Sequence, residues 1–126
     1  MKYINDFDGA SKKGIGVALD LVRRFNVSDL DVVQFDVENT GASALTDLRL
    51  YGRSAPSAPM RDITPASWTS ESALLFSPAA ASPASLTAGA SAKFGLNVTA
   101  MYEIEIHAAG AGAVLSIAGG GFKVQS

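Results

Sequence analysis

The residues with the clearest chemical capacity are two carboxylates and the chain's single histidine, which share one short segment: Glu103, Glu105 and His107. In a β-strand, residues two apart point to the same face, so these three side chains would form a row. Carboxylate oxygens and an imidazole nitrogen are ligands for a divalent cation. Successive members of such a row, however, are about 6–7 Å apart, too far for neighbours to share one ion. We therefore interpret the row as the solvated outer face of a strand.

Three other patterns carry weaker chemical signals. The pairs Asp6 and Asp8, and Asp29 and Asp31, have the spacing found in calcium loops, but the further ligands of such a loop are missing. The glycines at 119–121 could cradle an anion, but no helix follows them to supply its positive end. We expect neither a metal ion nor a cofactor, and we interpret the glycine run as a turn or bulge.

An enzyme would need an acid–base pair in a cleft, for example Glu38 or Asp36 with Glu71. No spacing in the chain selects these residues. We therefore predict that the protein is not an enzyme, and we name no catalytic residue.

The pattern of the whole chain is that of β-strands. Val33, Phe35 and Val37 alternate with polar residues, which is the period of a strand with one buried face, and a turn sequence follows at 39–41. Similar short segments recur without a convincing helix, and this predicts an all-β, two-sheet antiparallel sandwich of about eight strands. The expected strands are 14–25, 32–39, 45–51, 72–76, 91–98, 102–108, 113–118 and 121–125, with the glycines at 119–121 as a break between the last two.

We expect residues 1–12 to form an N-terminal arm. Residues 13–126 are then expected to form a single sandwich domain with long Ala/Ser/Pro-rich loops at 52–70 and 77–87. The arm carries Tyr3, Ile4 and Phe7 in a run too short to form an element, and it either folds back on its own domain or docks on a neighbour. Trp68, near the end of the first long loop, either caps the core or anchors an interface. These four residues, Tyr3, Ile4, Phe7 and Trp68, are the candidate interface, because aromatic side chains dominate interface energetics.

The segments 91–98 and 102–108 fit two arrangements. A hairpin that places Val98 opposite Tyr102 would pair Leu96 with Ile104 and so match apolar residues on one face. Alternatively, the two strands lie in opposite sheets, as in immunoglobulin topologies.

Two blocks of sequence support the second arrangement. Residues 33–41 read VQFDVENTG and are followed by the apolar–basic–apolar run at 48–50, and residues 86–100 read LTAGASAKFGLNVTA before the strand YEIEI at 102–106. Together these blocks resemble CARDB-like sandwiches, bacterial immunoglobulin-like modules related in fold to fibronectin type III. The resemblance implies a tyrosine corner at Tyr102 and a binding or structural module, and it brings no catalytic residues.

The overall charge, the cysteine count and the hydropathy of the chain exclude further classes of protein. The 126-residue chain has a formal net charge of −2, which does not suggest a nucleic-acid-binding surface, and its basic clusters at 12–13 and 23–24 are modest. It has no cysteine and hence no disulfide framework. Its N-terminus has acidic residues where a signal peptide needs an apolar stretch, and no window is long enough to span a membrane. We expect a protein made in the host cytoplasm that contacts neither nucleic acid nor membrane.

These features favour a structural protein of a larger assembly. We expect a bacteriophage virion protein that decorates or cements a capsid, is located in the virion, and forms a homo-oligomer, a trimer, which binds capsid or other virion proteins. The alternative is an adhesion or carbohydrate-binding module of an exported bacterial protein. An exposed aromatic platform that binds glycans would favour that alternative.

Overall fold

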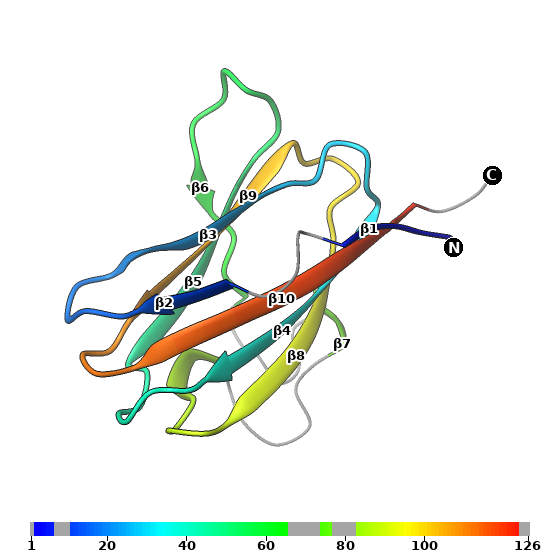
Figure 1. Ribbon diagram of the computed structural model, residues 1–126. Helices are drawn as coiled ribbons and strands as arrows, with labels where there is room; N and C mark the ends of the chain where they lie inside the picture. Colours follow the sequence, from blue (N-terminus) through cyan, green and yellow to red (C-terminus); the bar gives the residue numbers. More distant parts are fainter. Residues whose placement is uncertain (1, 7–10, 66–73, 77–82, 124–126) are drawn as a thin grey trace.

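The computed structural model describes residues 2–6, 11–65, 74–76 and 83–123, with the backbone alone given for 2–6, 11 and 74–76. Within these residues, ten strands form two antiparallel sheets packed face to face (Figure 1). The all-β, two-sheet sandwich that the sequence predicts is therefore confirmed. The elements are β1 Lys2–Asp6, β2 Ser11–Gly14, β3 Asp20–Asn26, β4 Val32–Asn39, β5 Asp47–Arg53, β6 Arg61–Asp62, β7 Leu74–Phe76, the 3-10 helix η1 Pro83–Ser85, β8 Ser91–Asn97, β9 Glu103–Ala109 and β10 Val114–Lys123.

The order of the strands is that of an immunoglobulin sandwich with its first and last strands exchanged. Sheet A runs β1-β10-β4-β8-β7, with β2 also paired to β10, and sheet B runs β3-β9-β5-β6. The strands β4, β8 and β7 take the positions of immunoglobulin strands B, E and D, and β5 and β9 take those of C and F. The last strand β10 lies beside β4, where the first immunoglobulin strand lies, and β3 lies beside β9. The segments 91–98 and 102–108 are thus in opposite sheets rather than in one hairpin.

The core lies between the sheets, and the alternation of buried and less buried residues is most regular along β4 and β5. Three rings connect the two layers: Phe25 of sheet B lies 4.8 Å from Phe35 of sheet A, measured between ring centroids, and Phe35 lies 5.5 Å from Phe94. Phe35 and Phe94 are directly opposite each other in the β4–β8 register. Aromatic pairs at these separations add to the stabilisation that comes from burial alone.

The expected strand at 14–25 is wrong as a single element. The chain instead forms β2, a loop at 15–19 and β3, which lie in different sheets. The regular alternation of Ile15, Val17, Leu19 and Leu21 is what made the segment look continuous. Ile15 is buried, whereas Val17 is 83% exposed, so this alternation does not mark one buried face.

The expected break at the glycines 119–121 is also wrong, because β10 runs through them without interruption. Gly119 and Gly121 lie on the side of β10 that faces the core. A Cβ at Gly119 would lie 2.8 Å from the ring of Phe35, and one at Gly121 would overlap the side chain of Leu30. The glycines are therefore strand residues whose missing side chains make room for Phe35 and Leu30.

The N-terminal segment folds back on its own domain. Residues 2–6 pair as β1 with Gly120–Lys123 of β10, and Ser11–Gly14 pair as β2 with Val114–Ile117. The expectation that the N-terminal arm forms no secondary structure is therefore wrong for residues 2–6 and for residues 11–12, which lie in β1 and β2. The expected loop at 52–70 also contains a strand, because Arg61–Asp62 pair with β5 as β6.

Candidate interaction surface

The outer face of sheet B carries the row that the sequence singles out. Glu103, Glu105 and His107 do lie on one face of β9, but the face is less solvated than expected, because Glu105 is only 7% exposed. Arg24 of β3 lies opposite Glu105, and its Nη2 is 2.6 Å from Glu105 Oε2. On the other carboxylate oxygen, His107 Nε2 lies 3.0 Å from Oε1. The ring of Tyr51, from β5, packs edge-on against His107.

These contacts set the ionisation of Glu105. Burial raises the pKa of the carboxyl, but the hydrogen bonds from His107 and Arg24, with the charge of Arg24, together outweigh it, so the pKa lies below its usual value of 4.5. The charged form of Arg24 is favoured too, because its hydrogen bond to Glu105 raises the pKa of the guanidinium. The pair is thus ionised at neutral pH and joins β3 to β9.

Acidification should expose the contribution of Glu105 to stability. Since its pKa is lower in the folded protein, the unfolded chain binds the proton first; the stabilisation is complete above about pH 4.5 and is lost as the pH falls through the lowered pKa. We expect Glu105→Gln to reduce the loss of unfolding free energy over this interval, measured by urea denaturation at several pH values. Arg24→Met should reduce it as well, since it removes a partner that lowers this pKa. An unchanged pH dependence in both variants would contradict the assignment.

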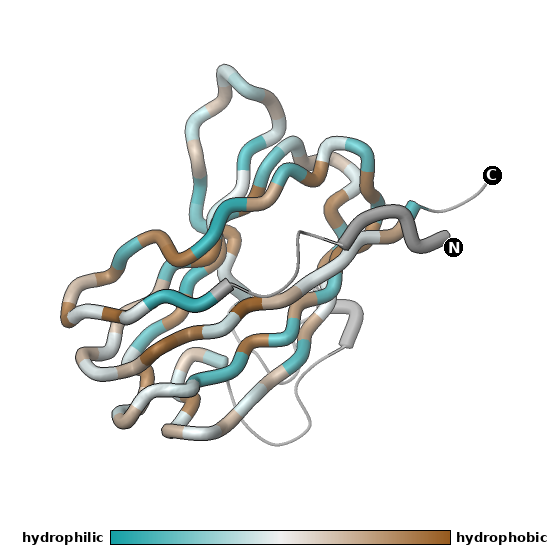
Figure 2. Tube along the Cα trace, viewed as in Figure 1, coloured by the Kyte–Doolittle hydropathy of each residue, from teal (hydrophilic) through white to brown (hydrophobic). Residues whose placement is uncertain are grey.

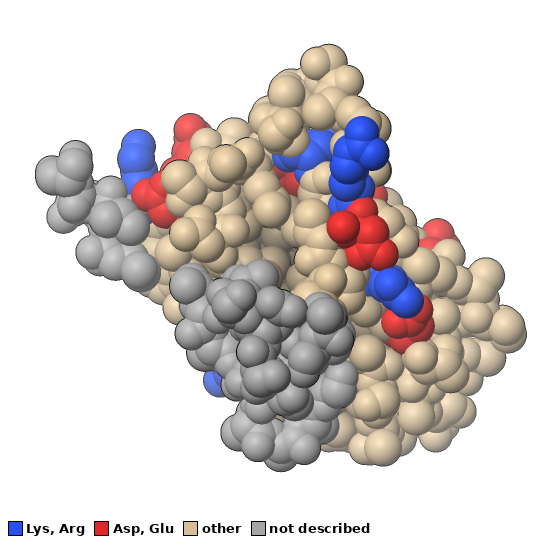
Figure 3. Space-filling view, turned by 180° about the vertical axis from the view of Figure 1, so that it is seen from behind, with Lys and Arg blue, Asp and Glu red and all other residues tan. Residues whose placement is uncertain are grey.

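The remaining charges of this face also neutralise one another. Arg53 Nη2 lies 2.8 Å from Glu103 Oε1, and Arg49 contacts both Asp47 and Asp62 at 3.1 and 3.2 Å. On the side shown in Figure 3, basic and acidic side chains are interspersed and neither sign covers a large area. In the part of the chain that the structure describes, no three His, Cys, Asp or Glu side chains are grouped to hold a metal ion.

A different surface stands out at one end of the sandwich, which we call the loop end. Four connections meet there, at the left of Figure 1, and backbone hydrogen bonds join three of them to one another and the fourth, at 87–90, to Asn39. Gly110 N donates to Gly16 O at 2.9 Å, and Ala42 N donates to Gly112 O at 3.1 Å. The loop end consists of residues 15–19, 40–46, 87–90 and 110–113.

A buried asparagine organises the loop end. The side chain of Asn39, at the end of β4, is 0% exposed. Its Nδ2 donates to Ser43 O at 2.8 Å and to Leu86 O at 3.1 Å, while its Oδ1 accepts from Gly41 N at 3.0 Å and from Val114 N at 3.3 Å. One amide thereby joins the connection at 40–46 to Leu86, which precedes the connection at 87–90, and to the start of β10. The turn at 39–41 is therefore a structural centre rather than an ordinary surface turn.

The glycines of the loop end allow its segments to approach closely. A Cβ at Gly41 would lie 2.5 Å from Val114 N, which only a shift of the backbone could relieve. Gly110 has a φ of +143° and a virtual Cβ 2.8 Å from Ala44 O. A side chain at either position would push two connections apart.

The exposed residues of the loop end are all uncharged. They are Gly, Ala, Ser, Thr, Val and Leu, and Figure 2 shows these loops mostly in white and brown. The connection at 15–19 supplies the apolar tip, with Val17 83% and Leu19 39% exposed. Charged residues are depleted in the buried centre of protein–protein interfaces, and exposed apolar patches mark interaction sites. The loop end therefore has the properties of a docking surface.

Of the candidate interface residues named from the sequence, the structure places only the backbone of two. Tyr3 and Ile4 lie in β1, of which the backbone alone is given, and Phe7 and Trp68 lie outside the described residues, as does Glu71. Asp36 and Glu38 are exposed on β4, with Asp36 Oδ2 4.0 Å from Lys93 Nζ. Tyr102, the expected tyrosine corner, precedes β9; its N–H donates to Arg53 O, and its ring lies 5.8 Å from the Arg53 guanidinium.

Sequence reasoning missed Val17 and Leu19 because it placed both inside the single expected strand at 14–25. One signal was available. Gly14 and Gly16 flank the buried Ile15, and two glycines so close together favour a loop over a strand interior. With that loop, the apolar residues that follow become exposed.

Comparison with known proteins gives no match to a family model, to a curated protein or to a solved structure. Among the described residues the one helix is the three-residue η1, so none of them forms a helix that could cross a membrane.

Proposed function

We propose that the protein is a non-enzymatic structural subunit of a larger protein assembly, and that it docks through its loop end. The observation that carries the proposal is the loop end itself. It is held in shape by Asn39 and by backbone hydrogen bonds, it exposes no charge, and it projects Val17. A rigid, uncharged surface loses little conformational freedom when a partner covers it.

We favour a bacteriophage capsid as the assembly, with this protein as its decoration or cement subunit. A capsid presents the same protein face many times, and a small domain with one rigid docking end suits such a lattice. The backbone of β1 and β2 pairs with β10 of their own domain, so the proposal places the contact at the loop end and not in these strands. The free protein is expected to be a homo-oligomer, a trimer.

Co-sedimentation with capsids tests this function. The purified protein is added to isolated capsids of the phage that carries the gene, and the bound amount is measured over a range of protein concentrations. We expect saturable binding at a fixed ratio to the capsid protein. Because the loop end is uncharged, the dissociation constant should change less than about three-fold between about 50 and 500 mM NaCl.

Two results would contradict the proposal. Absence of saturable binding would exclude the capsid as the partner. Binding that weakens steeply with salt would show that charged residues, and hence another surface, make the contact.

A further inference from the structure

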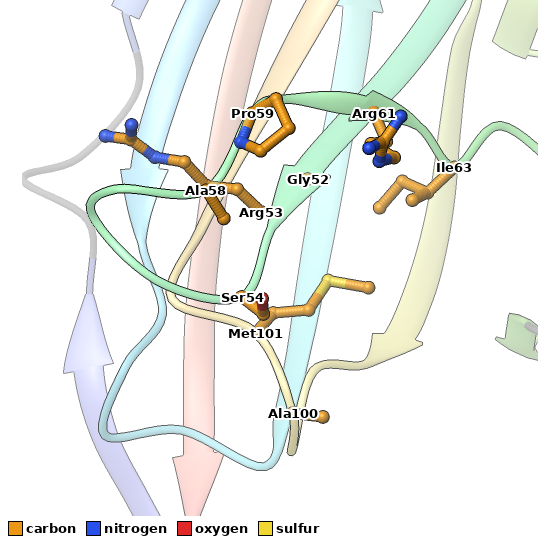
Figure 4. A pocket seen from close by; sticks show the side chains of 9 residues that line it. All are labelled: Gly52, Arg53, Ser54, Ala58, Pro59, Arg61, Ile63, Ala100 and Met101. Atoms are coloured by element: carbon orange, nitrogen blue, oxygen red, sulfur yellow. The ribbon is translucent and has the colours of Figure 1, made fainter.

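At the end of the sandwich opposite the loop end, the structure has an open groove of about 460 Å³ (Figure 4). The β5–β6 hairpin forms one side, and the turn between β8 and β9 forms the other. Met101 and Ile63 line the groove, and both pack against the core. Gly52 lies beneath them: a Cβ there would be 3.1 Å from Ile63 Cδ1 and 3.2 Å from Met101 Sδ. The groove therefore offers an apolar wall to an aliphatic group.

The charge at the groove comes from Arg61. Residues along β6 alternate in direction, and Asp62 points to the outer face, where it contacts Arg49 and accepts from Thr64 N. Arg61 lines the groove instead and is exposed, with no ion pair to a described residue. The second arginine, Arg53, also lines the groove, but its guanidinium is already paired with Glu103.

The edge of the sheet lies beside this charge. Among the described strands, β6 is the last of sheet B, so beyond it no described strand uses its outward backbone groups. An extended peptide can add to such an edge, with its backbone as the source of affinity and a side-chain pocket as the source of specificity.

From this combination we propose that the groove binds the C-terminal aliphatic residue of a partner polypeptide. The aliphatic side chain enters against Met101 and Ile63, the terminal carboxylate pairs with Arg61, and the preceding residues lie along β6. A cavity of this volume suits one or two residues. This site is separate from the loop end and does not depend on the capsid proposal.

NMR of protein labelled at the methionine methyl groups tests the proposal. The probe is the acetylated tetrapeptide Ala-Ala-Ala-Leu with a free carboxylate; its controls are the same peptide as a C-terminal amide, the peptide ending in Ser, and isovalerate. We expect the free-carboxylate peptide to shift the Met101 methyl signal in a saturable manner, with at least about ten-fold weaker binding for the amide, the Ser peptide and isovalerate. Arg61→Gln should weaken binding to a similar extent, while Lys93→Gln on sheet A should leave it unchanged.

Three outcomes would overturn the assignment. An unshifted Met101 signal at millimolar peptide would show that the groove takes no such ligand. Equal binding of the acid and the amide, or unchanged binding in Arg61→Gln, would show that the peptide carboxylate does not pair with Arg61. Isovalerate binding as tightly as the peptide would show that the occupant is a small acid rather than a polypeptide.

Discussion

Replacement of Asn39 by Ala is expected to lower the free energy of unfolding by about 3 kcal/mol, which corresponds to a fall in Tm of roughly 10 °C for a domain of this size. The Asn39 amide makes four hydrogen bonds, to Ser43 O, Leu86 O, Gly41 N and Val114 N. Because the side chain is 0% exposed, water cannot take over these bonds without opening the structure. Leaving buried polar groups unpaired costs more free energy than a typical hydrogen bond contributes to stability. Urea denaturation and calorimetry measure both quantities.

Asn97 provides a matched control. It also ends a strand, and its Oδ1 accepts from Thr99 N at 3.0 Å in the same kind of turn, but it is exposed. Asn97→Ala should therefore cost less than about 1 kcal/mol. Similar losses for Asn39→Ala and Asn97→Ala would show that Asn39 contributes only its local turn and does not hold the loop end together.

The second large effect is expected at the apolar tip of the loop end. The double variant Val17→Asp/Leu19→Asp should weaken capsid binding at least about 100-fold, because it removes two aliphatic contacts and forces two carboxylates to lose water on docking. Val17 is 83% exposed in the free protein, so its replacement should leave the fold intact. Co-sedimentation measures the affinity, and circular dichroism together with Tm monitors the fold.

The control for this variant introduces the same charge at the opposite end. Thr99→Asp/Ala100→Asp changes two exposed residues of the turn between β8 and β9 and likewise adds two negative charges. We expect it to bind capsids as the wild-type protein does. An equal loss in both double variants would mean that net charge governs binding, and unchanged binding of Val17→Asp/Leu19→Asp would show that the tip is not in the interface.

The central strands of the fold could be predicted because each has one strictly apolar face. Val33, Phe35 and Val37 all point into the core, and the segments that became β8 and β9 follow the same pattern. Placing β8 and β9 in opposite sheets required more than periodicity, because apolar faces match equally well in a hairpin. There the resemblance to immunoglobulin-like modules favoured the arrangement that the structure shows.

The loop end could not be predicted, since its properties come from contacts between segments far apart in the sequence. Asn39 reads as an ordinary turn residue until Leu86 and Val114 are placed around its amide. The position of Val17 has the same origin, because β2 pairs with β10 in sheet A and β3 pairs with β9 in sheet B. That separation of the two strands forces the intervening residues into an exposed connection.

The central claim is that the loop end is the surface covered in the assembly, and amide hydrogen exchange of free and capsid-bound protein tests it most directly. We predict slower exchange on binding in residues 15–19, 40–46, 87–90 and 110–113, with unchanged exchange in β9 and β5 of sheet B. Protection confined to sheet B or to the β5–β6 hairpin, with the loop end exchanging as in the free protein, would contradict the account.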